Sequence, residues 1–546
     1  MSVKNGDYAF SQEEKPLFPG APYSPRHSGR NRAIYAFSAF VMAMAGGLGN
    51  GLITSNLNSI AGDMGLYVVE ANLLVAVYVA FNATANLLLV KARVQFGIPA
   101  TMHVVFGALV AAQLVQILAP SLGTAILARA VSGIAAGGLT TLSLYNIFQV
   151  FPLRLRPVAA VVGFSLPQLA VPVARMFPLT QIALDHWRGL HLVELAMAIA
   201  AWAMLGLMPL PPNVRDKAFE PLDALTAGLT VAAMLLICSA LALGRYYWWT
   251  DAAFLGWAFA AALPLLALGL LIEDRRARPL LWVRWYATRD ILFFTVIAVV
   301  VRIALSEQTY AAVGLLAFGG LTSDQLHPLF AVVFLAMAAG IVAASVLLKA
   351  ERVIPMIMAA AFIIAVGAWL DTGSTIETRP QQLYLSQALI GFGTTMFLGP
   401  ALMFGIGHIV KRGPNYLVSF VVLFSTTQNV GGLAGSALLG SIQVARERVH
   451  AEHLAEALSL GDPAVVARIA QYSATIAPRL SDPVARAQQA NALLGQALHA
   501  QASVLAFNDT FWVVTLVALG IGLFIAGVLT LQIIRPRPPQ TAGATS

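Results

Sequence analysis

Fourteen apolar runs, most of them separated by short polar breaks, fill the chain from Ala33 to Ile534. Each run is about 20 residues or longer, which is enough for a helix to cross roughly 30 Å of hydrocarbon. A bilayer offers the backbone no hydrogen-bond partners, so runs rich in Leu, Ala and Val are expected to be helices and not strands. We predict helices over 33–60, 71–90, 100–119, 124–150, 158–184, 190–210, 222–243, 252–272, 291–318, 326–348, 353–371, 381–409, 416–443 and 508–534. The fold class is therefore an all-α integral membrane protein with 14 transmembrane helices.

The basic residues gather in alternate breaks between these runs. Of the 33 Lys and Arg residues, 22 fall on one side of the predicted membrane, eight on the other and three inside helices, and all six lysines are on the first side. The positive-inside rule makes that side cytoplasmic, and an even number of spans places both termini there. We expect a multi-pass protein of the inner (plasma) membrane. The net charge of +8 reflects this bias and no single basic surface, so nucleic acid is not an expected partner.

The two ends of the chain differ in composition from its middle. Residues 1–32 carry four prolines among charged and small residues and lack an apolar core, so we expect a disordered cytoplasmic tail and not a cleavable signal peptide. Residues 535–546 are expected to form a second cytoplasmic tail. The single cysteine, Cys238, lies in an apolar run and excludes an internal disulfide framework or a multi-cysteine metal site. No cofactor and no metal ion are expected.

Weak internal repetition indicates two halves. Val90-Lys91-Ala92-Arg93-Val94 after the second run resembles Leu348-Lys349-Ala350-Glu351-Arg352-Val353 after the tenth. We therefore predict two six-helix bundles with a pair of helices inserted between them. The bundles span 33–210 and 290–534, and the inserted helices and a central cytoplasmic linker occupy 211–289.

A polar outer segment over 445–503 precedes the last run. Asp462-Pro463 and Asp482-Pro483 each combine a helix N-cap with proline at the first helical position. We predict two or three short helices lying over the outer face. They would form either a structural cap or a docking surface for a partner, such as a periplasmic adaptor protein.

Ionisable residues at membrane depth are the natural candidates for function, because the bilayer makes them costly unless they face a cavity or a partner. The deep ones are Arg129, Arg175, Arg302 and Glu307. Glu307 is the deepest carboxylate and is the candidate proton carrier; a neutral glutamate bonded to a backbone carbonyl is the alternative. Arg302 and Glu307 are about 140° apart around a helix, so each is expected to have its partner on another helix.

The substrate cavity is predicted to include Arg175, Arg302, Asn56 and Gln428. Three deep arginines against one deep carboxylate favour anionic or neutral substrates over cations. Three further carboxylates are expected nearer the outer surface: Asp63, Glu70 and Glu194.

The chain resembles the fourteen-helix drug:proton antiporter branch of the major facilitator superfamily (the EmrB/QacA type). The resemblance rests on the inserted helix pair, on the long outer segment before the last helix, and on the arginine-centred run Leu127-Ala128-Arg129-Ala130-Val131-Ser132-Gly133. It implies a major facilitator fold, proton-coupled multidrug efflux, and a role for Arg129 in proton coupling. A structural ion pair that ties its helix to a neighbour is the other interpretation of Arg129.

Two departures from this family leave the direction and coupling of transport open. The loop after the second run, Val94-Gln95-Phe96-Gly97-Ile98-Pro99, lacks the aspartate that the family places there. The fifth run keeps only Pro172 of the glycine and proline pairs regarded as an antiporter hallmark.

Other classes are disfavoured by missing motifs. The chain has no Gly-Lys dipeptide and hence no Walker A motif for ATP, and it has no HExxH or GxSxG pattern of an enzyme. The sequence thus favours a secondary active transporter, namely a proton-coupled exporter of small amphiphilic compounds whose partners are protons, a small-molecule substrate and the lipid bilayer. The alternatives are a uniporter or importer of a specific solute and a transport-inactive membrane sensor.

Overall fold

A computed structural model describes residue 11 and residues 13–16, 20–177, 186–410, 416–459 and 461–534. Its regular structure is helical. The α-helices are α1 (Gly29–Ser55), α2 (Leu57–Asp63), α3 (Val68–Phe96), α4 (Ile98–Leu118), α5 (Leu122–Val150), α6 (Arg156–Ser165), α7 (Ala170–Arg175), α8 (His186–Leu207), α9 (Pro221–Tyr247), α10 (Ala253–Asp274), α11 (Val283–Tyr286), α12 (Arg289–Ala304), α13 (Ala312–Phe318), α14 (His327–Leu347), α15 (Val353–Asp371), α16 (Tyr384–Val410), α17 (Tyr416–Ala457), α18 (Pro463–Ile476) and α19 (Pro483–Ile534). A 3-10 segment, η2 (Leu166–Leu169), joins α6 to α7, and a π-helical segment, η4 (Glu307–Ala311), precedes α13.

Within the described residues, twelve helical segments are long and apolar enough to cross a membrane. Two of the fourteen expected segments are not among them, although both are helical. Segment 291–318 is divided among α12, η4 and α13, and segment 416–443 forms the first part of α17, where five consecutive polar residues occupy 425–429. The chain is thus a multi-pass membrane protein, and the count of fourteen spans stays a prediction.

The long helices pack in two groups. In the first group α5 packs against α1, α3, α4 and α6, and α8 packs against α1 and α4. In the second group α16 packs against α14 and α15, and α19 packs against α12, α15 and α17. The groups meet along α3 and α17 on one side, and along α6, α7, α14 and α16 on the other. The predicted domain boundaries, before residues 211 and 290, fall between α8 and α9 and at the start of α12.

Close helix contacts in the first group depend on glycine. A β-carbon on Gly47 of α1 would lie 2.3 Å from the Ala170 β-carbon of α7, and one on Gly133 of α5 would lie 2.6 Å from the Tyr78 carbonyl oxygen of α3. Both glycines belong to Gly-x-x-x-Gly spacings of the sequence, which allow helix backbones to approach closely in membranes.

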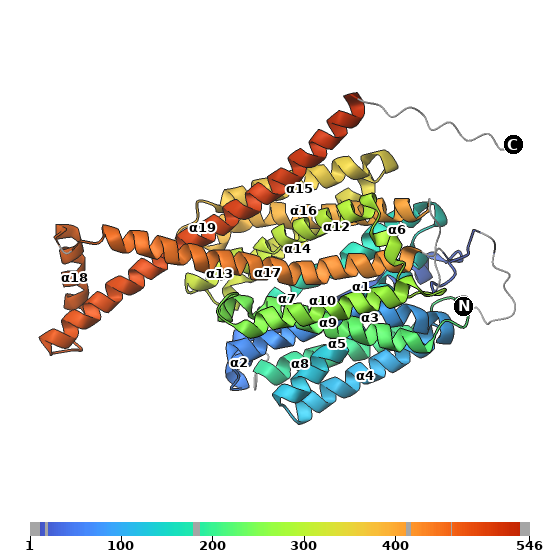
Figure 1. Cartoon of the computed structure of the whole chain (residues 1–546), viewed down its shortest axis with the longest axis horizontal. Coiled ribbons are helices and arrows are strands. Elements are labelled where there is room, and N and C mark those ends of the chain that lie inside the picture. The colour runs from blue at the N-terminus through green and yellow to red at the C-terminus, as the bar shows by residue number, and fades with distance from the viewer. Residues whose placement is uncertain are drawn as a thin grey trace.

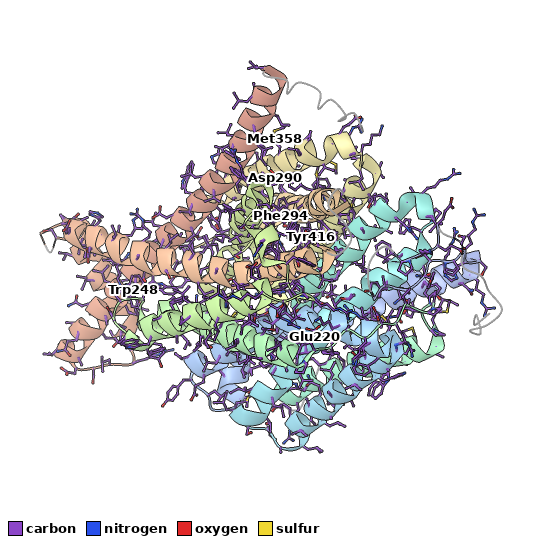
Figure 2. The ribbon with its side chains drawn as sticks, turned by 45° about the vertical axis from the view of Figure 1, so that its right-hand side comes forward. Glu220, Trp248, Asp290, Phe294, Met358 and Tyr416 are labelled. Atoms are coloured by element: carbon purple, nitrogen blue, oxygen red, sulfur yellow. The ribbon has the colours of Figure 1, made fainter. Side chains whose placement is uncertain are left out.

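Helices α9 and α10 lie outside the two groups. They pack against each other, and α9 also contacts both α3 and α17. Figure 2 shows Glu220, which precedes α9, and Trp248, which follows it, at opposite ends of this helix. At the Trp248 end, the indole nitrogen of Trp249 donates to the Ser441 hydroxyl of α17 (2.7 Å). The inserted pair therefore covers the line along which α3 and α17 meet.

A buried ionic network joins α9 to α3 at the Glu220 end. The Asp223 carboxylate, which is fully buried, accepts from the Lys91 ammonium of α3 (2.8 Å) and from the Arg276 guanidinium (2.6 Å). Arg276 also pairs with Glu220 and Glu273, at 2.7 Å each. Burial acts to lower the pKa of Arg276, but the hydrogen bonds to these three carboxylates raise it overall. The inserted pair is thus held to the first group by charges that satisfy one another.

The outer segment 445–503 projects from the bundle, which corrects the expectation that it lies over the outer face. Figure 1 shows α17 and α19 extending far past the other helices, with α18 across their far end. The predicted starts at Asp462 and Asp482 are present, because α18 and α19 begin at Pro463 and Pro483. Apart from α18, however, the segment continues the two long helices. Docking of a partner here stays a prediction.

Residues 20–28, part of the expected disordered tail 1–32, instead lie against the first group. Ala21 is buried, and Gln149 of α5 donates from its amide nitrogen to a backbone carbonyl of this segment (3.1 Å). The His27 ring bonds the Gln149 amide oxygen (2.9 Å). A segment whose polar groups find partners in this way is ordered despite its proline content; residues 1–10 lie outside the described part of the chain.

Candidate functional site

A cavity of about 820 Å³ lies between the two groups of helices. Its lining comes from α1, α3, α5, α6, η2 and α7 on one side and from α12, α16 and α17 on the other. It extends to Arg93 in the last turn of α3 and Arg156 at the start of α6, so it lies toward the end of the molecule where α1 begins. At the opposite end the two groups touch through a buried apolar cluster that includes Leu52, Leu169 and Phe330.

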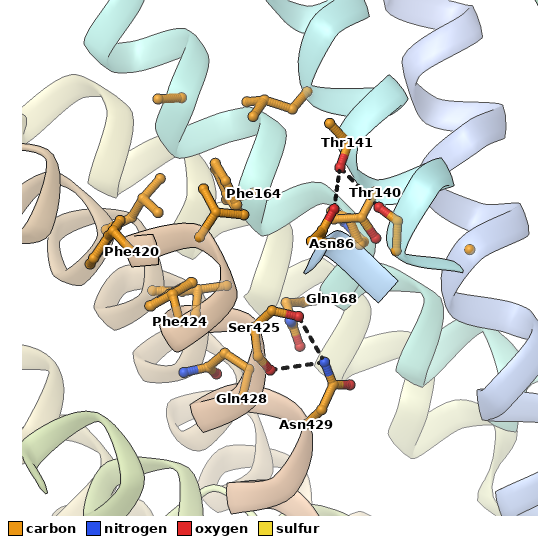
Figure 3. Close-up of a pocket in the computed structure, with 18 of the residues that line it drawn as sticks. Asn86, Thr140, Thr141, Phe164, Gln168, Phe420, Phe424, Ser425, Gln428 and Asn429 are labelled. Atoms are coloured by element: carbon orange, nitrogen blue, oxygen red, sulfur yellow. Dashed lines mark hydrogen bonds between the residues drawn. The ribbon is translucent and has the colours of Figure 1, made fainter. Parts of the chain in front are cut away.

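The cavity has a polar wall and an aromatic wall, which Figure 3 shows on different sides of the pocket. Asn86, Thr140 and Thr141 lie on the polar wall. The aromatic wall combines Phe164 of α6 with Phe420 and Phe424 of α17; the ring centroids of Phe164 and Phe424 are 6.2 Å apart, and those of Phe420 and Phe424 are 5.9 Å apart. Such a site suits a molecule that is polar on one side and apolar on the other.

The charged residues of the lining are all arginines: Arg93, Arg156 and Arg302, with no carboxylate among the described residues that line the cavity. Arg302 donates from Nε to the Gln428 carbonyl oxygen (3.0 Å), and Arg156 donates to backbone carbonyls of residues 13 and 15. The cavity is therefore positively charged.

Two carboxyl groups are buried together in the second helix group. Glu307, in the π-helical segment, is fully buried and Asp371, at the end of α15, is 1% exposed. The Gln387 amide nitrogen of α16 donates to Glu307 Oε1 (3.1 Å) and to Asp371 Oδ2 (2.8 Å). No ion pair joins either carboxyl to a cation in the described part of the chain. Two ionised carboxylates so placed would repel each other in a low-dielectric interior, and one proton shared by the pair relieves that repulsion.

The carboxyl pair and the cavity share one structural element. Arg302 lies in the last turn of α12, and Glu307 follows five residues later in η4. Each has its partner on another helix, as expected: Arg302 on α17 and Glu307 on α16. π-Helical segments are often found at functional sites, because they break the regular helix and re-aim its side chains.

Arg129 does not line the cavity but lies in a buried network beside it. Its guanidinium donates to the Gly49 carbonyl (2.5 Å) and to the side chain of Asn50 (2.8 Å), which does line the cavity, and it lies 4.4 Å from the centre of the Tyr78 ring. Its carboxylate partner is Glu194 of α8, at 3.6 Å. Glu194 is thus buried within the first helix group, and its predicted place nearer the outer surface stays a prediction.

The same network continues away from the cavity. The Gln113 amide nitrogen of α4 donates to Glu194 Oε2 (2.6 Å) and to the Ser132 hydroxyl of α5 (3.0 Å), and the His191 ring bonds the Gln113 amide oxygen (2.5 Å). Five helices of the first group, α1, α3, α4, α5 and α8, are joined in this way, and these contacts support the structural interpretation of Arg129.

The remaining predicted residues are dispersed. Gln428 lines the cavity with Arg302, whereas Arg175 and Asn56 do not. Arg175 lies 5.6 Å from the centre of the Phe330 ring of α14, where the two helix groups meet. Asn56 ends α1 and donates to the Leu52 carbonyl. Asp63 is exposed at the end of α2, and Glu70 caps the start of α3 by accepting from a backbone N–H.

Three important residues escaped the sequence analysis. Arg93 was counted with the cytoplasmic breaks, yet it is 2% exposed and lines the cavity. Asp371 was placed at a helix end, and Gln387 was given no role within the predicted helix 381–409. An available signal was that Asp371 ends an otherwise strongly apolar run. Among the described residues no group of three or more His, Cys, Asp or Glu side chains could hold a metal ion.

Comparison of the sequence with known proteins finds only distant similarity. No protein-family model matches the chain. A curated relative, an uncharacterized MFS-type transporter YhcA of Bacillus subtilis (strain 168), is 21% identical over 356 residues. That match covers 63% of this chain and 64% of the relative, so the chain spans less than two thirds of the length of the curated relative it matches.

Solved structures match over most of the chain. The human organic anion transporter MFSD10 (TETRAN) is 12% identical with a TM-score of 0.52, covering 90% of this chain and 100% of that one. The proton:xylose symporter XylE, bound to 6-bromo-6-deoxy-D-glucose, is 12% identical with a TM-score of 0.53, covering 91% and 97%. Tetrameric PepTSo2 is 12% identical with a TM-score of 0.55, covering 92% and 99%. The protein is therefore a multi-pass membrane protein with the fold of the major facilitator superfamily.

Proposed function

We propose that this protein is a secondary active transporter, a proton-coupled exporter of small amphiphilic compounds of the anionic or neutral kind. The cavity supplies the substrate site: it lies between two helix groups that also touch through an apolar cluster at the opposite end, and rocking of one such group against the other gives alternating access. Its polar and aromatic walls fit an amphiphilic molecule. Assignment to the fourteen-helix drug:proton antiporter branch, with both termini cytoplasmic, is part of this proposal.

The observation that carries the proposal is the buried pair of Glu307 and Asp371. Neither carboxyl contacts a cation in the described part of the chain, and a single amide bridges them. Buried ionisable groups in membrane proteins commonly belong to proton relays. Because Glu307 and Arg302 lie on one continuous segment, gain or loss of a proton at the pair can shift a residue that lines the cavity.

Arg129 has a supporting role in this scheme. Its ion pair with Glu194 ties two helices together, so the network can keep the first helix group rigid. Proton exchange is therefore assigned to the pair in the second group, and Arg129 is assigned to positioning Asn50 at the cavity.

Substrate-dependent proton movement in proteoliposomes tests the proposal. Purified full-length protein is reconstituted with a trapped pH-sensitive dye, and anionic, neutral and cationic amphiphiles are added at zero membrane potential. A saturable pH change with at least one compound, reversed when the substrate gradient is reversed, is the expected result. Saturable substrate flux without any proton movement would instead indicate a uniporter, and absence of flux across the whole panel would indicate a sensor.

A further inference from the structure

Arg93 is a buried cation with no carboxylate partner among the residues that the structure describes. It is 2% exposed, it lines the cavity, and its Nε and one terminal nitrogen have no hydrogen-bond partner. Its guanidinium carbon lies 5.8 Å from the centre of the Tyr145 ring, and no carboxylate pairs with it in the described part of the chain. A buried charge normally has a partner, because leaving it alone costs several kcal/mol.

The other unsatisfied group of the lining is also a donor. The Gln428 amide nitrogen, on the α17 side of the cavity, is buried and has no partner. Among the described residues, the buried side-chain atoms of the lining without a partner are thus N–H donors, and none of them is an acceptor. A ligand that pairs with these donors must therefore bring hydrogen-bond acceptors, such as acid oxygens.

The aromatic wall indicates that the rest of the ligand is apolar. Phe164, Phe420 and Phe424 pack against one another and together give the cavity an apolar, aromatic side. Planar guanidinium groups bind carboxylate and sulfonate oxygens with two parallel hydrogen bonds, which gives them both charge and geometric preference for such acids.

We propose that the substrates are amphiphilic organic acids and that Arg93 is the residue that recognises their acid group. The acid oxygens accept hydrogen bonds from Arg93, and the apolar body lies against the phenylalanine wall. This assignment rests on the proposed function, in that it takes the cavity to be the transport site, and it narrows the substrate class to anions.

A set of three ligands with one apolar body tests the assignment without any mutation. Binding of 1-naphthoate, 1-naphthamide and 1-naphthylmethylammonium to the purified full-length protein is measured by isothermal titration calorimetry. We expect naphthoate to bind at least tenfold more tightly than naphthamide, and the ammonium compound to bind most weakly. Equal affinities, or tighter binding of the ammonium compound, would refute the proposal.

Variants then assign the acid group to a residue. Arg93→Gln should weaken naphthoate binding at least tenfold and change naphthamide binding less than threefold, and Arg93→Lys should retain part of the preference. Arg284→Gln, which removes an exposed arginine outside the cavity, is the matched control and should change neither. If Arg93→Gln weakens both ligands equally, its role is structural; if only Arg302→Gln weakens naphthoate, the acid group binds elsewhere. Either result overturns the assignment.

Failure of this inference differs from failure of the proposed function. The binding assay uses no membrane gradient, so a protein that prefers naphthoate but moves nothing refutes transport alone. A protein that couples protons to the movement of neutral or cationic compounds, with no preference for the acid, refutes the role of Arg93 alone.

Discussion

Removing one carboxyl of the buried pair should disconnect transport from the proton gradient. Glu307→Gln and Asp371→Asn each replace a carboxyl by an amide of nearly the same size, and each leaves the other carboxyl in place beside Gln387. Because both carboxyls bond the same amide nitrogen, at 3.1 and 2.8 Å, we take the pair to exchange one proton per cycle.

One proton per cycle sets the size of the effect. A difference of one pH unit supplies about 1.4 kcal/mol per proton, which supports about tenfold accumulation of a substrate whose movement is otherwise electroneutral. Two pH units support about a hundredfold accumulation on the same basis. In either variant the ratio of the substrate concentrations on the two sides of the membrane should fall to about one.

The assay is accumulation of a labelled substrate in proteoliposomes, with the membrane potential held at zero by potassium and valinomycin. Exchange of substrate between equal concentrations should persist in both variants, since the cavity is unchanged. Glu452→Gln, an exposed carboxylate on the projecting part of α17, is the control and should accumulate like the parent protein. Tenfold accumulation by Glu307→Gln would remove the pair from coupling, and a hundredfold ratio at one pH unit in the parent would show that the pair exchanges more than one proton.

Three further outcomes follow from other parts of the structure. In Asp223→Asn, the buried cations Lys91 and Arg276 each lose a carboxylate partner. We therefore expect the free energy of unfolding to fall by about 3 kcal/mol and the Tm in detergent to fall with it. An unchanged Tm would contradict the network's role. Burial lowers the pKa of His27 below its ordinary value of 6.5, so the neutral ring is favoured when the tail is docked, and docking should weaken as the pH falls below about 6.5. A spin label one residue before His27 should become more mobile at pH 5.5 than at pH 7.5, and His27→Gln should remove that change. In a Cys238→Ala protein, a cysteine at Ser473 should react with an impermeant thiol reagent from outside, and one at Lys217 only after the membrane is opened; the opposite pattern would reverse the predicted topology.

The class of the protein and most of its helix positions could be predicted from the sequence, because a helix that spans the bilayer needs a long apolar run and such runs are directly visible in the sequence. It also identified Glu307 and Arg302 as residues with partners on other helices, since helical geometry prevents them from pairing with each other. The partners themselves could not be predicted. Asp371 and Gln387 are far from Glu307 in the chain, and only the packing of α15 and α16 brings them together.

Residues near helix ends were the hardest to place. Arg93 and Glu194 were assigned to opposite surfaces by their distance from the middle of an apolar run, yet both are buried. A helix of the bundle can be tilted or covered by other segments, so depth along the sequence does not give depth in the protein. Gly20 of the tail, for example, lies against Arg93 and Val94. From the sequence, both of these residues belong to a cytoplasmic break between helices.

The placement of α9 and α10 also bears on the access of lipid-soluble molecules to the cavity in the proposed transport cycle. Two lateral seams separate the helix groups, one along α3 and α17 and the other where α6 and α7 face α14 and α16. The inserted pair occupies the first seam, and the charges around Asp223 fasten it there. If the cavity is the transport site, a molecule dissolved in the surrounding lipid leaflet would meet α9 and α10 on this flank, and sideways entry from the bilayer would have to use the opposite seam.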